Sequence, residues 1–248
     1  EFLRRDLLPR LDRTTDELTN LLRGLSGGFV PAGPSGAPTR GMARILPTGR
    51  NFYSVDVHAI PSEAAWRVGV QAGDRLIEKY RSENDGRFPK TVAIIVWGTS
   101  TMRTHGDDVA EILHLMGCRP RWAKENRRVT GVELIPIEEL GRPRIDVTVR
   151  ISGFFRDAFA NVVSLIDDAV TLVASARESD AANPLRANVE SEMLRGIPEH
   201  EARFRVFGSK PGAYGAGLLN LIDERNWRTD EDLAKVYVAW GSYAYTRT

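Results

Sequence analysis

The chain has 248 residues, 42% of them hydrophobic, which suits one large globular domain or two small ones. Lysine and arginine total 34 against 33 acidic residues, so the net charge of +1 gives no reason to expect nucleic acid or an anionic membrane as a partner. A single cysteine, Cys118, excludes an internal disulfide, and no Cys/His spacing typical of a zinc finger occurs. No apolar run approaches the roughly 18 to 20 residues that cross a membrane. We therefore expect a folded protein of the reducing cytoplasm.

The first 50 residues differ in pattern from the rest of the chain. Leucines recur at helical spacing through residues 2–25, at Leu7, Leu11, Leu18, Leu22 and Leu25. This predicts an amphipathic helical segment whose apolar face needs a partner surface. Residues 26–50 are too rich in Gly and Pro for a helix or a central strand. The loop either holds an anion through Arg40, Arg44 and Arg50 or serves as a solvated linker.

Residues 51–248 alternate between strand-like and helix-like patterns and form the second predicted domain, after a peripheral segment 1–50. The predicted strands cover residues 91–97, 129–135, 145–151 and 203–207. The predicted helices cover residues 61–80, 109–116, 159–176, 218–224 and 230–240. This alternation predicts an α/β fold with a doubly wound, mainly parallel sheet flanked by helices, a helical amino-terminal segment and a helical carboxy-terminal end.

Polar, Gly-flanked loops follow three of the predicted strands, after Trp97, Ile151 and Phe207. The carboxyl ends of parallel strands meet at one edge of a sheet, so we expect these loops to gather there around a ligand. The loop after Trp97 is predicted to stay irregular until Asp107 or Asp108 caps the next helix.

The Gly-rich segment 208–217 resembles a phosphate loop but lacks the Gly-Lys-Ser/Thr ending that would hold phosphates and magnesium. We therefore do not expect this chain to hydrolyse ATP by itself. The segment either approaches a ligand closely, with Tyr214 stacking on a flat ring and Lys210 on a carboxylate, or forms a tight structural turn.

The four histidines are not spaced as a metal triad, which argues against a permanent zinc site. His105, beside Arg103 and two aspartates, is the one weak candidate for a metal ligand. Arg142 and Arg156 either pair with acidic neighbours or bind the acidic groups of a ligand through their planar guanidinium groups.

Several motifs together resemble the large subunit of cobaltochelatase, the CobN type, which is related to the H-type subunit of magnesium chelatase. They are Gly-Pro-Ser-Gly-Ala-Pro-Thr-Arg-Gly at 33–41, Leu-Pro-Thr-Gly-Arg-Asn-Phe-Tyr-Ser-Val-Asp at 46–56, Trp-Gly-Thr at 97–99, Glu-Leu-Gly-Arg-Pro-Arg-Ile-Asp-Val at 139–147, and Ser-Gly-Phe-Phe-Arg-Asp at 152–157. Residues 207–217, with Asn-Trp at 226–227 and Tyr-Val-Ala-Trp-Gly at 237–241, resemble the cobalt branch rather than the magnesium branch. Members of the family are several times longer, so the resemblance implies a carboxy-terminal piece.

The resemblance implies insertion of Co²⁺ into hydrogenobyrinic acid a,c-diamide, a corrinoid macrocycle, during aerobic cobalamin biosynthesis. It also implies AAA+ partner subunits of the CobS and CobT type that bind ATP and Mg²⁺, and contacts with the remainder of its own subunit. We predict substrate contacts at Ser35, Arg40, Arg50, Asn51, Trp97, Arg103, Arg142, Arg156, Lys210 and Tyr214. Asp107, Asp108 and Glu133 are the candidates for proton or metal transfer.

Two positions depart from the pattern of the family. Val57-His58 stands where proline and a basic residue are expected, and His105 stands where relatives carry glycine. These departures argue against His58 and His105 as obligatory cobalt ligands. Two alternatives stay open: an H-type magnesium chelatase subunit acting on protoporphyrin IX, and a non-catalytic docking module for the AAA+ subunits.

Overall fold

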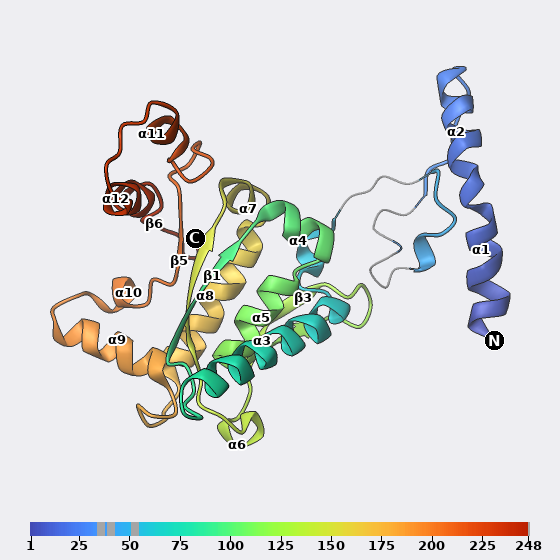
Figure 1. The fold of residues 1–248 in the computed structure, drawn as a ribbon. Helices are drawn as coiled ribbons and strands as arrows, with labels where there is room; N and C mark the ends of the chain where they lie inside the picture. The colour runs from blue at the N-terminus through green and yellow to red at the C-terminus, as the bar shows by residue number, and fades with distance from the viewer. Residues whose placement is uncertain (34–37, 39–42, 51–54, 248) are drawn as a thin grey trace. The chain divides into compact units, whose positions relative to one another are not determined.

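The computed structural model describes residues 1–33, 38, 43–50 and 55–247, which fall into two compact units, Glu1–Asp56 and Val57–Thr248 (Figure 1). The first unit is helical at its start, as predicted. It consists of a π-helical turn η1 (Leu3–Leu7), α1 (Leu8–Asp12), a 3₁₀ turn η2 (Arg13–Thr15) and α2 (Asp16–Leu25), followed later by a 3₁₀ turn η4 (Ala43–Ile45). The leucines of α2 are exposed, with Leu25 77% accessible. Within the described residues of this unit, nothing covers the apolar face of α2.

The second unit is built on a four-stranded sheet. Its strands are β1 (Thr91–Val96), β4 (Asp146–Ile151), β5 (Val206–Gly208) and β6 (Tyr243–Ala244), in the order β1-β4-β5-β6. The pairs β1–β4 and β4–β5 are parallel, with Val96 opposite Ile151 and Ile151 opposite Gly208, whereas β6 is antiparallel to β5. The predicted fold class, a mainly parallel α/β sheet flanked by helices, is confirmed.

A separate hairpin pairs β2 (Cys118–Trp122) with β3 (Val129–Leu134) in antiparallel fashion. The sequence predicted the extended segment at β3 but not its partner. Strand β2 was missed because its sequence, Cys-Arg-Pro-Arg-Trp, lacks the apolar pattern of a strand and contains a proline that disfavours sheet.

Helices surround the sheet in the second unit (Figure 1). They are η5 (Val57–Ala59, 3₁₀), α3 (Glu63–Glu83), α4 (Gly98–Thr104), α5 (Asp107–Met116), α6 (Ile137–Leu140), α7 (Gly153–Ala158), α8 (Ala160–Ser175), α9 (Pro184–Leu194), α10 (Glu199–Ala202), α11 (Leu219–Asp223) and α12 (Asp230–Trp240). The prediction of an irregular loop after Trp97 was wrong, because α4 begins at Gly98. Its turn is stabilised by the Thr101 hydroxyl, which donates to the Trp97 carbonyl over 3.0 Å.

The core lies on one face of the sheet. Val147, Val149 and Ile151 point from β4 into this core and are at most 2% exposed. Helices α5 and α8 pack against this face, and α8 buries the predicted stripe, Val163, Ile166, Val170 and Val173. Both α5 and α8 therefore run back from the carboxyl edge of the sheet, as in other parallel α/β folds.

Helix α3 packs on α5 through two glycines. A Cβ at Gly69 would lie 2.5 Å from the Ala110 Cβ and 2.6 Å from the Glu111 amide nitrogen. A Cβ at Gly73 would have its nearest neighbour 3.0 Å away, in the ring of His114. The backbones of the two helices therefore approach closely at Gly69, where the neighbouring atoms have little room to shift.

We expect Gly69→Ala to lower the free energy of unfolding by about 1–3 kcal/mol through overpacking, although alanine raises helix propensity by roughly 1 kcal/mol over glycine. Gly73→Ala is the matched control, because it brings the same gain in helix propensity while its added methyl group contacts only side-chain atoms. Urea denaturation of both variants measures the difference. Equal stability of the two variants would contradict the close approach at Gly69.

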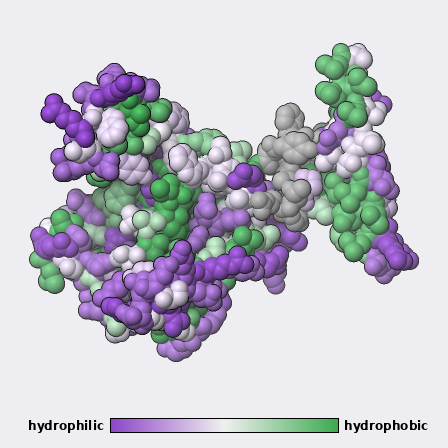
Figure 2. All heavy atoms as spheres, viewed as in Figure 1, coloured by the Kyte–Doolittle hydropathy of each residue, from purple (hydrophilic) through white to green (hydrophobic). Residues whose placement is uncertain are grey.

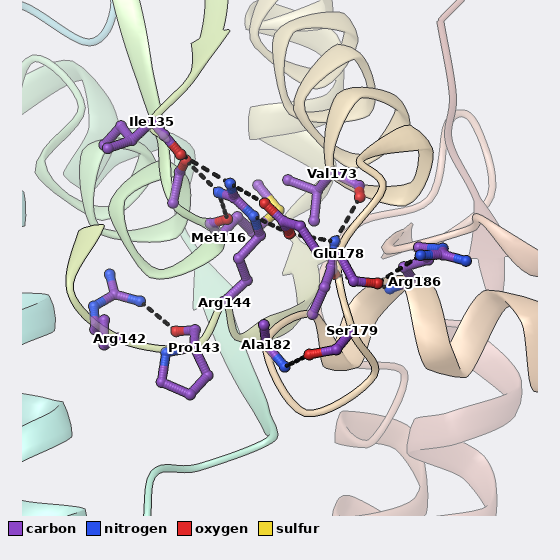
Figure 3. A network of polar contacts seen from close by, with 12 residues as sticks. Met116, Ile135, Arg142, Pro143, Arg144, Val173, Glu178, Ser179, Ala182 and Arg186 are labelled. Atoms are coloured by element: carbon purple, nitrogen blue, oxygen red, sulfur yellow. Dashed lines mark hydrogen bonds and ion pairs between the residues drawn. The ribbon is translucent and has the colours of Figure 1, made fainter. Parts of the chain in front are cut away.

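One buried arginine, Arg144, which precedes β4, is the centre of a polar network (Figure 3). Its guanidinium group donates to both carboxylate oxygens of Glu178, over 2.8 and 2.7 Å. It also donates to the carbonyl oxygens of Gly117 and Ile135, each over 2.8 Å. The Asn183 amide donates to the same Glu178 carboxylate over 3.0 Å. The network joins the end of α5, the β2–β3 hairpin and the connection between α8 and α9.

Candidate functional site

Ser152 joins two of the loops at the carboxyl edge of the sheet. Its amide donates to the Val96 carbonyl over 3.0 Å, and its hydroxyl oxygen accepts from the Gly98 amide over 3.1 Å and from the Phe155 amide over 3.2 Å. The side chain thus caps α7 and also fixes the start of α4, although the two helices follow different strands.

Two glycines let the loops come together. A Cβ at Gly98 would lie 2.5 Å from the ring of Phe154 on α7. A Cβ at Gly153 would lie 2.7 Å from the Ala213 carbonyl oxygen and 2.7 Å from the Tyr214 ring. The loops after β1, β4 and β5 are therefore in van der Waals contact, as the sequence predicted for a parallel sheet.

Arg156 on α7 holds the Gly-rich loop after β5. Its side chain is 6% exposed, and one guanidinium nitrogen donates to the carbonyl oxygens of Ser209, Lys210 and Ala213 over 3.0, 2.7 and 3.1 Å. The other nitrogens donate to the two carboxylate oxygens of Asp157 over 2.7 and 2.9 Å. Arg156 is therefore occupied by the protein itself and positions the loop.

Asp157 and Tyr214 form an exposed pair beside this buried cation. The Tyr214 hydroxyl donates to Asp157 over 2.7 Å, and its ring centroid lies 5.5 Å from the Arg156 guanidinium carbon. Hydrogen bonds from Arg156, and next from Tyr214, hold the pKa of Asp157 below its ordinary value. The same contact with Asp157 raises the pKa of the Tyr214 hydroxyl. The pair is thus an anion with a neutral phenol that donates to it.

A small apolar pocket opens at the same edge. Its volume is about 170 Å³, and it is lined by Ile95, Trp97, Arg150, Ile151, Ser152, Gly215, Ala216 and Tyr237. The Arg150 guanidinium carbon lies 4.5 Å above the Tyr237 ring, so the one cation of the lining is stacked on an aromatic face. Ligand pockets usually measure roughly 300–1,000 Å³. This pocket therefore accommodates an edge or a substituent of a large ligand rather than all of it.

Exposed aromatic side chains stand around the pocket. Trp97, in its lining, is 55% exposed, and Tyr214, next to the lining residue Gly215, is 60% exposed. Lys210 is also exposed on the Gly-rich loop. The arrangement offers flat apolar surfaces with a cation nearby, which suits a flat ring that carries acidic groups.

Other predicted residues lie away from this pocket. Arg142 precedes β4 and donates to the His114 carbonyl over 2.6 Å and to the Leu115 carbonyl over 3.2 Å, at the carboxyl end of α5. It is separated from Ser152 by the length of β4, roughly 20 Å for six residues, so we place it outside the candidate site. Glu133 lies in the β2–β3 hairpin, where it pairs with Arg119.

The acidic residues at the start of α5 lie on the helix-covered side of the sheet. Asp107 and Asp108 are the first residues of α5 and are half-buried, while Arg103 is exposed in the last turn of α4. Burial raises the pKa of Asp108, and it also raises the pKa of Glu111 one turn later, with the charge of Asp108 as the second cause. Raised carboxyl pKa values are typical of groups that accept protons near neutral pH.

His105 adopts a left-handed conformation at the end of α4 and is 5% exposed. Among the residues that the structure describes, no group of three or more His, Cys, Asp or Glu side chains is arranged to hold a metal ion. Burial raises the pKa of the Cys118 thiol to about 12, so this side chain stays protonated and is a poor metal ligand. Likewise, none of the described helices is long and apolar enough to cross a lipid bilayer.

The remaining predicted residues belong to the first unit. Arg50 is exposed there, and the backbone of Gly33 approaches its side chain. Ser35, Arg40 and Asn51 lie outside the described residues.

Sequence reasoning did not single out Tyr237 for the site. Tyr237 comes from α12, more than eighty residues after β4, and no local pattern connects the two segments. The motif Ser-Gly-Phe-Phe-Arg-Asp contained Asp157, but only the fold shows that Asp157 and Tyr214 meet.

A mainly parallel α/β sheet with a pocket and exposed aromatic residues at its carboxyl edge is the arrangement typical of α/β domains that bind ligands. The family model described as CobN/Magnesium Chelatase matches residues 1–248, and the chain belongs to this family. It is 52% identical to the aerobic cobaltochelatase subunit CobN of Pseudomonas aeruginosa over 237 residues, covering 92% of this chain and 19% of that protein. It is 35% identical to the H-type subunit of magnesium chelatase from Chlorobaculum parvum over 239 residues, covering 96% of this chain and 19% of that protein.

A solved structure agrees with these relatives. The catalytic subunit of cobaltochelatase from Mycobacterium tuberculosis superimposes with a TM-score of 0.82 at 55% identity, covering 99% of this chain and 21% of that one. The chain thus spans about a fifth of the length of the proteins that it matches.

Proposed function

We propose that this chain is part of the large, tetrapyrrole-binding subunit of an ATP-dependent cobaltochelatase in aerobic cobalamin biosynthesis. The reaction inserts Co²⁺ into hydrogenobyrinic acid a,c-diamide. Identities of 52% and 55% to the two cobaltochelatase subunits, against 35% to the magnesium-chelatase subunit, favour the cobalt reaction over protoporphyrin IX as substrate. The partners are the remainder of the subunit itself and AAA+ ATPase subunits of the CobS and CobT type. These ATPase subunits bind ATP and Mg²⁺, and the complex works in the cytoplasm.

Metal insertion requires that the flat ring is held, that the metal loses its water and that the ring nitrogens lose protons. Trp97 and Tyr214 supply exposed aromatic surfaces for the ring, and the pocket beside Trp97 takes one edge of it. Lys210 and Arg103, both exposed, contact acidic groups of the macrocycle. Asp107 and Asp108, on the helix-covered side of the sheet, are the candidates for proton transfer, and burial raises the pKa of Asp108.

The observation that carries this proposal is the exposure of Trp97 and Tyr214 around an apolar pocket at the carboxyl edge of the sheet. Exposed large aromatic residues at such an edge mark a surface that another molecule covers. The pocket volume of about 170 Å³ is consistent with a site completed by the rest of the longer subunit.

We expect Trp97→Ala and Tyr214→Ala, each made in the longer subunit, to raise the dissociation constant for the corrinoid about 5- to 10-fold. Loss of stacking on one aromatic ring costs roughly 1 kcal/mol or more. The absorbance of the corrinoid during titration measures binding, and protoporphyrin IX is titrated in parallel. Trp227→Ala is the matched control, since this tryptophan is 40% exposed but does not line the pocket. Unchanged affinity in both site variants would refute the proposed site, and tighter binding of protoporphyrin IX would favour the magnesium reaction.

A further inference from the structure

Strand β1 lies at the edge of the main sheet, and no described strand pairs with its outer side. Its sequence, Thr-Val-Ala-Ile-Ile-Val, contains no charge, no proline and no glycine. Folded proteins usually protect an edge strand with charges, prolines or bulges, because an unprotected edge pairs readily with another strand. The outer edge of β1 has none of these protections.

The hydrogen bonds between β1 and β4 show which backbone groups of β1 point outward. The Lys90 carbonyl accepts from the Asp146 amide over 2.9 Å, and the Val96 carbonyl accepts from the Ser152 amide over 3.0 Å. Backbone groups alternate in direction along a strand, so the even-numbered residues of β1 face β4. Thr91, Ala93 and Ile95 therefore direct their amide and carbonyl groups away from the sheet.

The side chains of the same three residues are exposed, and Ile95 is 53% accessible. Figure 2 shows hydrophobic residues gathered over the strands, between α12 and α9. Thr91 lines a pocket of about 560 Å³ at the amino end of this face, together with Thr148 and Phe207, and Ile95 lines the smaller pocket at the carboxyl end. The exposed face of β1 thus extends from the larger pocket at the amino end to the smaller pocket at the carboxyl end.

We propose that an extended segment from the rest of the family's longer polypeptide adds to the outer edge of β1 as a further strand and places its side chains beside those of Thr91, Ala93 and Ile95. The occupant is argued from chain length, since about four fifths of each matched relative lies outside this region. A segment tethered to the domain reaches the edge at an effective concentration near millimolar, whereas a second copy must be recruited from solution. Strand addition satisfies outward backbone groups along β1 and packs cross-strand side chains against Ile95.

Hydrogen–deuterium exchange resolved to single amides tests the proposal on the 248-residue chain and on the longer subunit. We expect the amides of Thr91, Ala93 and Ile95 to exchange about 100-fold more slowly in the longer subunit, while the amide of Ile94, already bonded within the sheet, changes little. Equal exchange in the two proteins would overturn the proposal. Protection that appears in the 248-residue chain only at high concentration would also overturn it, by identifying a second copy as the occupant.

Proline at position 93 removes the outward amide without removing a hydrogen bond to β4, and edge strands tolerate proline at such positions. We expect Ala93→Pro in the longer subunit to abolish the slow exchange at Thr91 and Ile95, and Ala93→Val, which keeps the amide, to preserve it. Thr91→Pro, at the first position of the strand, is the second variant if Ala93→Pro does not fold. Slow exchange retained in a folded proline variant would contradict strand addition.

Discussion

Arg144→Ala is expected to lower the free energy of unfolding by about 3–5 kcal/mol, because it leaves the Glu178 carboxylate buried without its cation. Glu178 is 12% exposed at its side chain and accepts two hydrogen bonds from Arg144 (Figure 3). The substitution also leaves the Gly117 and Ile135 carbonyl oxygens without this donor. A loss of this size is a large share of the stability of a typical domain.

Urea denaturation followed by circular dichroism measures this loss. Arg195→Ala is the matched control, because Arg195 pairs with Glu192 in an exposed position and such pairs contribute roughly 0–1 kcal/mol. The double variant Arg144→Met/Glu178→Leu is expected to recover part of the loss, since it removes both buried charges. A loss under about 1 kcal/mol for Arg144→Ala would show that the network contributes little to holding α5, the β2–β3 hairpin and the α8–α9 connection together.

Arg156→Ala is expected to lower the free energy of unfolding by about 2–4 kcal/mol and to weaken corrinoid binding about 10-fold or more. The buried guanidinium holds three carbonyl oxygens of the Gly-rich loop and both oxygens of Asp157. Without it, the loop loses the geometry that places Tyr214 beside Asp157. The effect on binding is therefore indirect, through the position of Tyr214.

Two variants separate positioning from general destabilisation. Arg156→Lys keeps the charge but not the planar fork, so we expect an intermediate affinity. Tyr214→Phe keeps the ring but removes the hydrogen bond to Asp157, and we expect near-normal stability with a smaller loss of affinity. Denaturation and absorbance titration of the longer subunit measure both quantities. Normal affinity in a folded Arg156→Ala variant would contradict the positioning role.

The arginines show where sequence reasoning reached its limit. Arg142, Arg144 and Arg156 look alike in the sequence, each beside Gly, Pro or acidic residues. Each of them also has partners from 27 to 57 residues away, at the end of α5, in the turn after α8 or in the loop after β5. The prediction that Arg142 and Arg156 contact the substrate was made without knowledge of these partners, because burial and long-range hydrogen bonds leave no local pattern in the sequence. Ser35, Arg40 and Asn51 stay predictions.

The sequence by itself determined four of the six described strands, most of the helices, the mainly parallel sheet and the family. These features depend on local periodicity, turn residues and short motifs, such as the alternating apolar residues of β4. The tertiary structure alone decided that Arg156 faces inward, that Tyr214 meets Asp157, that Tyr237 closes the pocket and that β1 keeps an open edge. Each of these depends on which distant segments pack together, and packing reflects the burial of the whole chain rather than the pattern of any one segment.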